Sequence, residues 1–187
     1  MCPLHASAIN KVVGQGDRQA PLMFIGEGPG QREDEEGLAF VGAAGQLLTR
    51  MLSAIYLSRD RVYICNVVKC RPPGNRIPTD DEITACIMHL RMQVALIRPK
   101  VIVLLGGTAL KATLGPNRYI TRERGVWYER KGVWMMPTYH PSALLRDPVK
   151  KRDAWADMQS LQNRLMDLGL YQDIYGQSPS DADADRS

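Results

Sequence analysis

The sequence lacks a long apolar run, a leader segment and a dense cysteine framework. One of its longest apolar runs, Val101–Leu105, is far shorter than the roughly 20 residues that a membrane-spanning helix requires. In Met1–His5 no charged stretch leads into an apolar one, so we expect no signal peptide. The chain has only four cysteines, which in a cytosolic protein are expected as thiols or metal ligands rather than disulfides. These absences predict a cytoplasmic protein with no membrane partner.

The size and charge of the chain suit one domain with an anionic partner. Its 187 residues fit a single sizeable core, and 24 Lys and Arg against 20 Asp and Glu give a net charge of +4. Residues 178–187 hold three Asp and one Arg, a net charge of −2, so the rest of the chain carries +6. Such a body suits an anionic partner, although many soluble proteins are as basic. We expect residues 1–170 to form the domain and residues 171–187 to form a polar, acidic, disordered tail.

Four short apolar runs have the composition of buried strands. Continuous apolar strands indicate a sheet that is covered on both faces. Segments with apolar side chains three and four residues apart follow these runs. The alternation predicts an α/β fold, a three-layer α/β/α sandwich with a central, mainly parallel four-stranded sheet. The expected strands are Leu22–Ile25, Val62–Val67, Val101–Leu105 and Val133–Thr138, and the expected helices are Gly45–Ile55, Asp80–Ile97, Gly107–Leu114 and Asp153–Leu168.

Glycine, polar or basic residues follow all four expected strands. In folds of this class, ligands bind beyond the carboxyl ends of the strands, so these residues predict a single active-site edge. In strand order, the segments are Gly26–Gly30, Asn66 with Lys69–Pro73, Gly106–Gly107 and His140–Ser142.

The glycine-rich segment Gly26–Gly30 is the first candidate ligand site. Three glycines in five residues let the backbone turn tightly and approach a ligand closely. Gly42–Gly45 leads into an expected helix, whose free N–H groups could hold a phosphate. The spacing matches neither a dinucleotide-binding nor a Walker A motif. A tight strand-to-helix turn without a ligand explains the pattern equally well.

Two further strand ends carry hydrogen-bonding side chains. The Asn66 amide donates and accepts at once, so it can read a pyrimidine edge, unless it only caps the last backbone groups of its strand. His140 suits a general acid or a donor to a developing oxyanion. Leu144, Leu145 and Arg146 suit an exposed wedge that enters a base stack; the alternative is a helix start with its leucines in the core.

Taken together, these segments resemble the family 4 uracil-DNA glycosylases, the iron–sulfur branch of the uracil-DNA glycosylase superfamily. The likeness runs from about Cys2 to Leu168, and four motifs in family order are far more specific than any one of them. The resemblance implies a DNA-repair enzyme that flips uracil out of DNA and hydrolyses its N-glycosidic bond, leaving an abasic site. The motifs are Gly26–Gly30, Phe40–Gly42 with Ala44 and Gly45, Asn66–Pro73 with Asn75 and Arg76, and His140–Ser142.

The resemblance implies how the uracil pocket is built. Phe40 would stack on the uracil ring. Asn66 would hydrogen-bond its Watson–Crick edge, where the cytosine amino group would meet a donor instead of an acceptor. Backbone groups at Glu27 and Gly28 would line the pocket, and Glu33 would help to shape it.

The resemblance also implies catalytic and DNA-binding roles. His140 would stabilise the negative charge on uracil O2 as the bond breaks. Glu27 is the first candidate for positioning water or stabilising the oxocarbenium-like sugar, and Asn75 is the second. The residues expected to contact DNA are Arg71, Arg76, Ser142, Leu144, Leu145 and Arg146.

The cysteines match the family pattern with one gap. Family members hold a [4Fe–4S] cluster through an early Cys-x-x-Cys pair and two later cysteines. Cys70 and Cys86 match the later pair and Cys2 the second early cysteine, whereas the first would fall at position −1. Three explanations stand: a chain that starts downstream of its natural start, a cluster with another fourth ligand, or free cysteines without a cluster. Cys65 is a poor substitute, because strand alternation points it away from Asn66.

Other functions stay open at this point. A sister branch of the superfamily takes a wider set of damaged bases, but Glu27 and Asn66 favour the uracil-focused branch. A non-catalytic uracil- or DNA-binding module would not need Glu27, Asn66 and His140 together. An incomplete ligand set argues against an electron-transfer iron–sulfur protein, and a flavodoxin-like nucleotide-binding protein would leave Leu144–Arg146 without a purpose. A monomer is the expected state of a one-site base-flipping enzyme.

Overall fold

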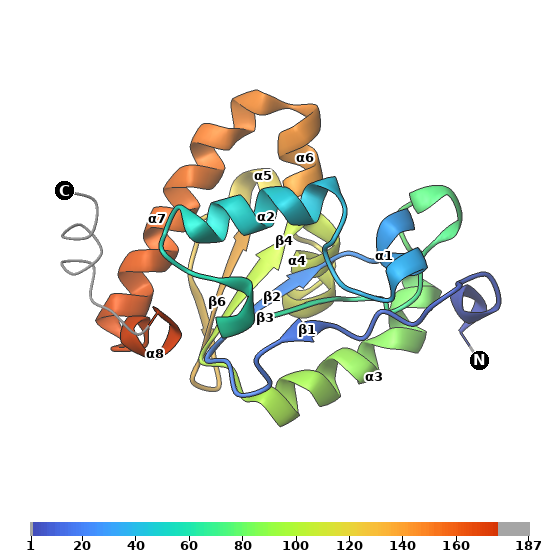
Figure 1. The fold of residues 1–187 in the computed structure, drawn as a ribbon, viewed down its shortest axis with the longest axis horizontal. Helices are drawn as coiled ribbons and strands as arrows, with labels where there is room; N and C mark the ends of the chain where they lie inside the picture. Colours follow the sequence, from blue (N-terminus) through green and yellow to red (C-terminus); the bar gives the residue numbers. More distant parts are fainter. Residues whose placement is uncertain (1, 176–187) are drawn as a thin grey trace.

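The computed structural model describes residues 2–175, in which a six-stranded sheet lies between layers of helices (Figure 1). The strand order is β1-β3-β2-β4-β6-β5. The four central strands run parallel and the two short edge strands run antiparallel to their neighbours. The predicted three-layer, mainly parallel architecture is confirmed. The strands are β1 (Gln15–Gly16), β2 (Leu22–Gly26), β3 (Tyr63–Asn66), β4 (Val101–Leu105), β5 (Tyr128–Arg130) and β6 (Val133–Thr138).

The predicted number of four strands is wrong, because both edge strands were missed. β1 has two residues and pairs with Tyr63 and Ile64 of β3. β5 is mostly exposed and forms a hairpin with β6 through Lys131 and Gly132, which have φ angles of 53° and 76°. An edge strand covers little of the core, so neither sequence contains the apolar run that marks the central strands.

The helices match the amphipathic segments, with several short additions. The long helix α3 begins and ends as predicted, and a capping box fixes its start: the Thr79 hydroxyl accepts from the Glu82 N–H (3.3 Å) and the Glu82 carboxylate from the Thr79 N–H (2.8 Å). The α-helices are α1 (Gln31–Glu36), α2 (Ala43–Ser53), α3 (Asp80–Ile97), α4 (Gly106–Leu114), α5 (Ile120–Glu123), α6 (Pro141–Arg146), α7 (Lys151–Asp167) and α8 (Tyr171–Tyr175); the 3₁₀ helices are η1 (Pro3–Ala6), η2 (Arg59–Arg61), η3 (Pro73–Asn75) and η4 (Pro148–Lys150).

The core has two halves, one on each face of the sheet. Phe24 of β2 packs in a cluster with residues of α2, α7 and α8, whereas its neighbour Ile25 packs with residues of α3 and α4. The same alternation divides β3, where Ile64 belongs to the first cluster and Cys65 to the second. Asn66 therefore follows on the α2 face, at the carboxyl end of β3, and Cys65 points to the opposite face as predicted.

The domain extends beyond its predicted boundary. Tyr171 and Ile174 of α8 are buried, and the Tyr171 hydroxyl donates to the Ile55 carbonyl (2.8 Å). The expected tail therefore begins too early at residue 171, and residues 176–187 lie outside the described residues. None of the helices described in residues 2–175 combines the length and the apolar character needed to cross a membrane.

Candidate active site

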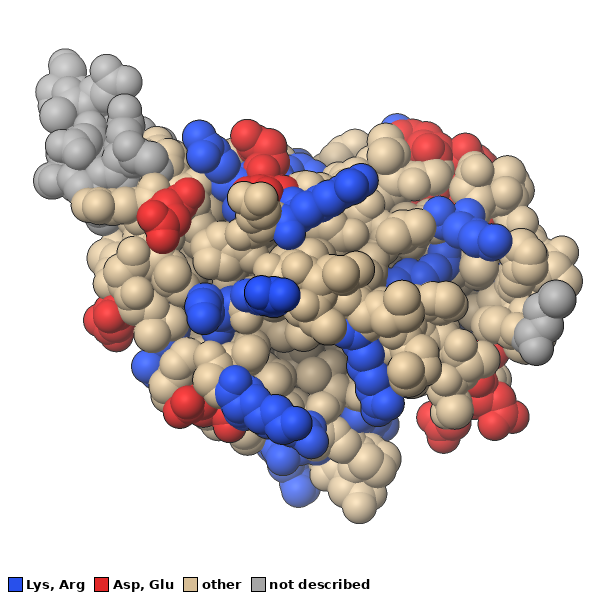
Figure 2. Space-filling view, turned by 90° about the horizontal axis from the view of Figure 1, so that it is seen from below, with Lys and Arg blue, Asp and Glu red and all other residues tan. Residues whose placement is uncertain are grey.

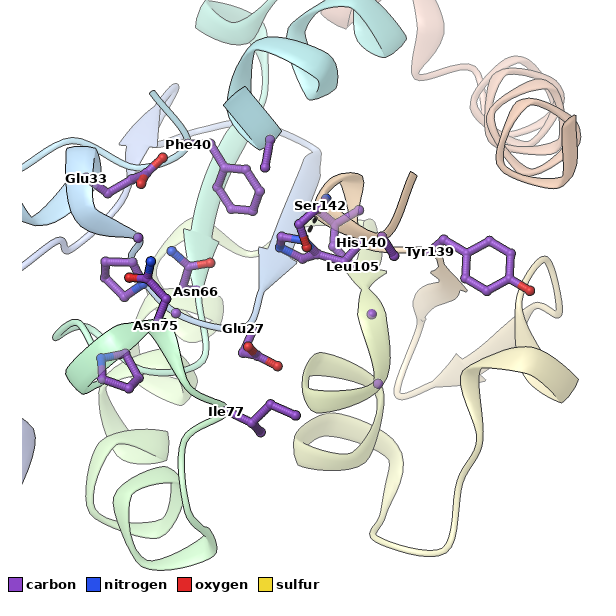
Figure 3. A pocket seen from close by; sticks show the side chains of 18 of the residues that line it. Glu27, Glu33, Phe40, Asn66, Asn75, Ile77, Leu105, Tyr139, His140 and Ser142 are labelled. Carbon is purple, nitrogen blue, oxygen red and sulfur yellow. Dashed lines mark hydrogen bonds between the residues drawn. The ribbon is translucent and has the colours of Figure 1, made fainter. Parts of the chain in front are cut away.

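A cavity of about 490 Å³ lies at the carboxyl edge of the parallel strands (Figure 3). Segments that follow β2, β3, β4 and β6 all line it, as the strand-end pattern predicts. Three expected DNA-binding residues, Arg71, Leu144 and Leu145, are not among its lining residues. The lining residues that the sequence predicted are Glu27, Gly28, Glu33, Phe40, Asn66, Asn75, Arg76, His140, Ser142 and Arg146.

Phe40 forms an apolar wall of this cavity. Its backbone φ of 54° lies in the left-handed region, which is uncommon for a bulky residue. A Cβ atom on Gly45 would lie 1.8 Å from the Phe40 carbonyl oxygen, so α2 can pack against this turn only with glycine at that position. The Phe40 ring centroid lies 5.7 Å from that of His140, with 35° between the planes. Phe40 and His140 therefore form adjoining walls.

Asn66 presents an amide whose oxygen has no protein partner. The residue is 1% exposed, and its Oδ1 has no hydrogen-bond partner among the described residues. A Cβ atom on Gly26 would lie 2.5 Å from both Asn66 Oδ1 and Phe40 Cζ, so glycine is required for the amide and the ring to approach each other. Lys69 Nζ holds the strand end by donating to the Asn66 carbonyl (2.6 Å) and to Gln93 Oε1 (2.5 Å). A buried polar atom without a partner costs about 1–3 kcal/mol, which favours a ligand that satisfies it.

His140 is held as a neutral imidazole with a defined orientation. Burial lowers its pKa to about 4, and the positive charge of Arg146 contributes to the shift. His140 Nδ1 accepts from the Ser142 N–H (3.2 Å) and lies 2.8 Å from the Ser142 hydroxyl. Because a backbone N–H can only donate, Nδ1 is the unprotonated nitrogen and the proton lies on Nε2. A Cβ atom on Gly106 would lie 3.0 Å from the His140 Cβ, so this glycine makes room for the imidazole.

The two candidate water-positioning residues have different partners. The Thr108 hydroxyl donates to Glu27 Oε2. Arg71 Nε donates to Asn75 Oδ1 (2.7 Å). Figure 3 shows Phe40, Asn66 and His140 around a common space, with the Glu27 carboxylate and Ile77 on the side away from Phe40.

The expected DNA-binding residues do not share one environment. The expectation of two exposed leucines is wrong for Leu144, which is 2% exposed and packs with Tyr139 and Ala154; α6 turns it into the core. Leu145 is 43% exposed. Arg76 lines the cavity, but its guanidinium forms a two-pronged ion pair with Glu82 (2.6 and 2.8 Å).

Sequence reasoning missed the residues that hold the predicted ones in place. Thr108 carries no motif signal, and it acts on Glu27 from another strand end. Arg59 of η2 donates to the carbonyls of Ala39 and Phe40, both at 2.8 Å. Each contact joins segments far apart in the chain, so spacing could not reveal it.

Three of the four cysteines gather, but they do not form a complete metal site. Burial raises the pKa of Cys70 and of Cys86, and the neighbouring Cys2 raises both further. Within residues 2–175, no group of three or more His, Cys, Asp or Glu is arranged to hold a metal ion. A [4Fe–4S] cluster takes four ligands, so the described residues do not fit a whole cluster.

Comparison with known proteins finds related sequences that cover most of this chain. Residues 13–159 match the sequence profile described as the Uracil DNA glycosylase superfamily. The chain is 46% identical over 170 residues to a type-4 uracil-DNA glycosylase of Sulfurisphaera tokodaii, covering 86% of this chain and 77% of that protein. It is 50% identical over 150 residues to a type-4 uracil-DNA glycosylase of Thermotoga maritima, covering 78% of this chain and 77% of that protein. Identity to a type-5 uracil-DNA glycosylase of Pyrobaculum aerophilum is 34% over 146 residues, covering 69% of this chain and 64% of that protein.

Proposed function

Because the chain belongs to the uracil DNA glycosylase superfamily, we propose that it flips uracil out of DNA and hydrolyses the N-glycosidic bond, leaving an abasic site. The observation that carries this proposal is the convergence of Phe40, Asn66 and His140 on one cavity. A flat apolar wall, an amide with an unpaired oxygen and a neutral imidazole match the ring face, the Watson–Crick edge and O2 of uracil.

The Asn66 amide explains a preference for uracil over cytosine. Its Nδ2 group donates to uracil O4, and its Oδ1 accepts from uracil N3–H. Cytosine carries an amino group in place of O4 and no hydrogen on N3, so it opposes donor to donor and acceptor to acceptor. Each unpaired group inside the pocket costs about 1–3 kcal/mol, which disfavours the wrong base.

His140 stabilises the leaving group by hydrogen bonding. When the bond between C1′ and N1 breaks, its electron pair moves onto the uracil, which carries negative charge on O2. The Nε2–H of the neutral imidazole donates to this oxygen. With a pKa of about 4, His140 enters the reaction uncharged and keeps its proton as a donor. Losing one such donor commonly costs on the order of 3 kcal/mol, or about a hundredfold in rate.

Glu27 is better suited than Asn75 to hold the attacking water. Thr108 engages only Oε2 of Glu27, and the carboxylate can take up a proton. Arg71 engages the one side-chain oxygen of Asn75, whose amide cannot serve as a base. The water oxygen bonds to C1′, and its proton passes through Glu27 to solvent.

DNA is the partner that the charge of the chain suits. Figure 2 shows the face that points downward in Figure 1, where Lys and Arg side chains lie over the middle and most Asp and Glu side chains lie toward the rim. Arg146 and Ser142 line the cavity and would contact phosphates, and Leu145, which is exposed, would enter the base stack. Binding that rests on phosphate contacts weakens as salt rises. A monomeric state and a cytoplasmic location stay predictions.

The iron–sulfur cluster belongs to the proposal only in part. Cys2, Cys70 and Cys86 would supply three ligands, and a further ligand would complete the set. Its role would be structural, so the chemistry above does not run through it. Anaerobic reconstitution with iron and sulfide, followed by analysis of bound iron and sulfide per chain, tests this; Cys70→Ser should abolish loading and Cys65→Ser should not.

A cleavage assay tests the function. A labelled duplex with one U opposite G is incubated with protein and then treated with alkali, which breaks the strand at abasic sites. We expect cleavage at U by the native sequence and a loss of about a hundredfold or more in His140→Ala and Asn66→Ala. Arg61→Ala, an exposed residue of η2, serves as the matched control. Uracil-specific binding without cleavage would instead support a non-catalytic module.

A further inference from the structure

The wall that Phe40 provides depends on an unfavourable backbone conformation. Its φ of 54° is uncommon for an aromatic residue, and in a free chain the extended and right-handed regions would compete with it. The surrounding structure must therefore hold residues 39–42 in place for the ring to keep its position.

Arg59 holds this turn from the carbonyl side. Its guanidinium donates from Nη1 to the Phe40 carbonyl and from Nη2 to the Ala39 carbonyl, both at 2.8 Å. Nη1 also lies within hydrogen-bond distance of Thr49 Oγ1 (3.2 Å) and the Gly45 carbonyl (3.4 Å) on α2. One planar cation therefore joins the turn to the helix that follows it.

Glu33 holds the same turn from the amide side. Its Oε1 accepts from the Val41 N–H (2.9 Å) and the Gly42 N–H (2.8 Å). Burial lowers the pKa of Arg59, whereas the negative charge of Glu33 raises it. The turn thus lies between a cation on its carbonyls and an anion on its amides, and neither contact involves the Phe40 ring.

We propose that Arg59 is a positioning residue for base recognition: its guanidinium fixes the left-handed turn at Phe40 so that the ring stands ready to stack on a flipped uracil. The inference rests on the proposed function. Arg59 is not among the residues that line the cavity, so it does not touch the base, and its shortest hydrogen bonds reach the cavity wall through the turn at Phe40. Its loss should weaken recognition of the base and leave docking of the DNA backbone intact.

Two DNA ligands separate these effects. One duplex carries 2′-fluoro-2′-deoxyuridine, which presents uracil and resists hydrolysis, and the other carries a tetrahydrofuran abasic site, which presents no base. Stacking of a base on an aromatic ring is worth about tenfold to a hundredfold in affinity. We therefore expect Arg59→Met to weaken binding of the uracil duplex by about tenfold and that of the abasic duplex by less than about twofold.

Four further proteins complete the test: Arg59→Lys, Arg61→Met, Phe40→Ala, and the double variant Phe40→Ala with Arg59→Met. Arg59→Lys, which keeps the charge but not the planar fork, should show a smaller loss confined to the uracil duplex. Arg61→Met should leave both affinities unchanged. In a Phe40→Ala background, Arg59→Met should cause no further loss, because the ring through which it acts is gone.

Three binding results would contradict the proposed role of Arg59. Equal losses on the two duplexes, no loss on the uracil duplex, or a full loss that persists with Phe40→Ala would each overturn it. If Arg59→Met fails to fold in a thermal-unfolding control, Arg59→Lys carries the comparison alone. Failure of the proposed function would appear differently: the native protein would bind the uracil duplex no more tightly than the abasic duplex. The inference would then fall with the proposed function.

Discussion

The protonation state of His140 allows a prediction that separates activity from stability. Burial and the charge of Arg146 lower its pKa to about 4, against about 6.5 for a free histidine. In the proposed mechanism the neutral imidazole of His140 is the active form, so uracil excision should not change with the protonation of this residue until the pH approaches 4, where the imidazole takes up a proton. We expect the single-turnover rate to show no inflection near pH 6.5 and to fall only in the more acidic range.

The free energy of unfolding should change between pH 6.5 and 4, the range in which activity stays constant. The unfolded chain takes up a proton on this residue below about pH 6.5, whereas the folded chain resists it until about pH 4. The contribution of the neutral imidazole to the free energy of unfolding is therefore fully present above pH 6.5. It is lost as the pH falls from 6.5 to 4. A difference of about 2.5 units corresponds to on the order of 3 kcal/mol.

Two measurements check this reasoning. Single-turnover excision of uracil is followed from about pH 3.5 to about pH 9, with urea unfolding at the same pH values, so that the range includes the predicted change near pH 4. His140→Gln should lose most of the activity and should also lose much of the acid dependence of unfolding between pH 6.5 and 4, because glutamine does not titrate. An activity inflection near pH 6.5, or an unchanged acid dependence in His140→Gln, would refute the assignment of a buried neutral imidazole.

Three further predictions test the walls of the cavity. Gly26→Ala places a Cβ atom 2.5 Å from both Asn66 Oδ1 and Phe40 Cζ, so we expect a loss of about 1–3 kcal/mol in the free energy of unfolding, measured in urea, and a far larger proportional loss of excision. Asn66→Asp replaces the amide donor with an acceptor, so the ratio of uracil excision to cytosine excision should fall by at least about tenfold in paired assays on U and C duplexes. An unchanged ratio would contradict the proposal that the Asn66 amide selects uracil over cytosine. Thr108→Val removes the hydroxyl that donates to Glu27 and should slow single-turnover excision about tenfold without weakening DNA binding, whereas Thr108→Ser should retain the native rate.

Much of the fold follows from local patterns in the sequence. The four central strands are continuous apolar runs, and α3 begins after a threonine that is followed by three acidic residues. What the patterns miss is short or lies at an edge, such as β1 with two residues and α6 with six. Because α6 was not predicted, the expectation for Leu144 was wrong. In a loop this side chain could face solvent, whereas in α6 it packs against Tyr139 and Ala154.

The candidate site, like the fold, could be predicted from the sequence only in part. Strand ends brought Glu27, Asn66 and His140 to one edge, because the carboxyl ends of parallel strands meet there. Some of the interactions that orient the cavity walls could not be predicted, since they join distant parts of the chain, unlike the local contacts of Ser142 with His140 and of Lys69 with Asn66. Thr108 and Glu27 are 81 residues apart, and Arg59 and Phe40 are 19 apart.

The pocket shows how a rigid recognition surface is made from groups that do not touch the base. Arg59 and Glu33 each use charge to bind backbone atoms of the turn at Phe40, and Lys69 does the same at the end of β3, beneath Asn66. Hydrogen bonds from charged groups are stronger than those between neutral ones, so they suit segments that must not relax when the cavity is empty. A pocket held in this way does not need to reorganise when uracil enters, and more of the binding free energy remains to offset unstacking of the flipped nucleotide. Under the proposed function the amide and the ring would recognise uracil, and the charges of Arg59, Glu33 and Lys69 behind them would keep both in the geometry that recognition requires.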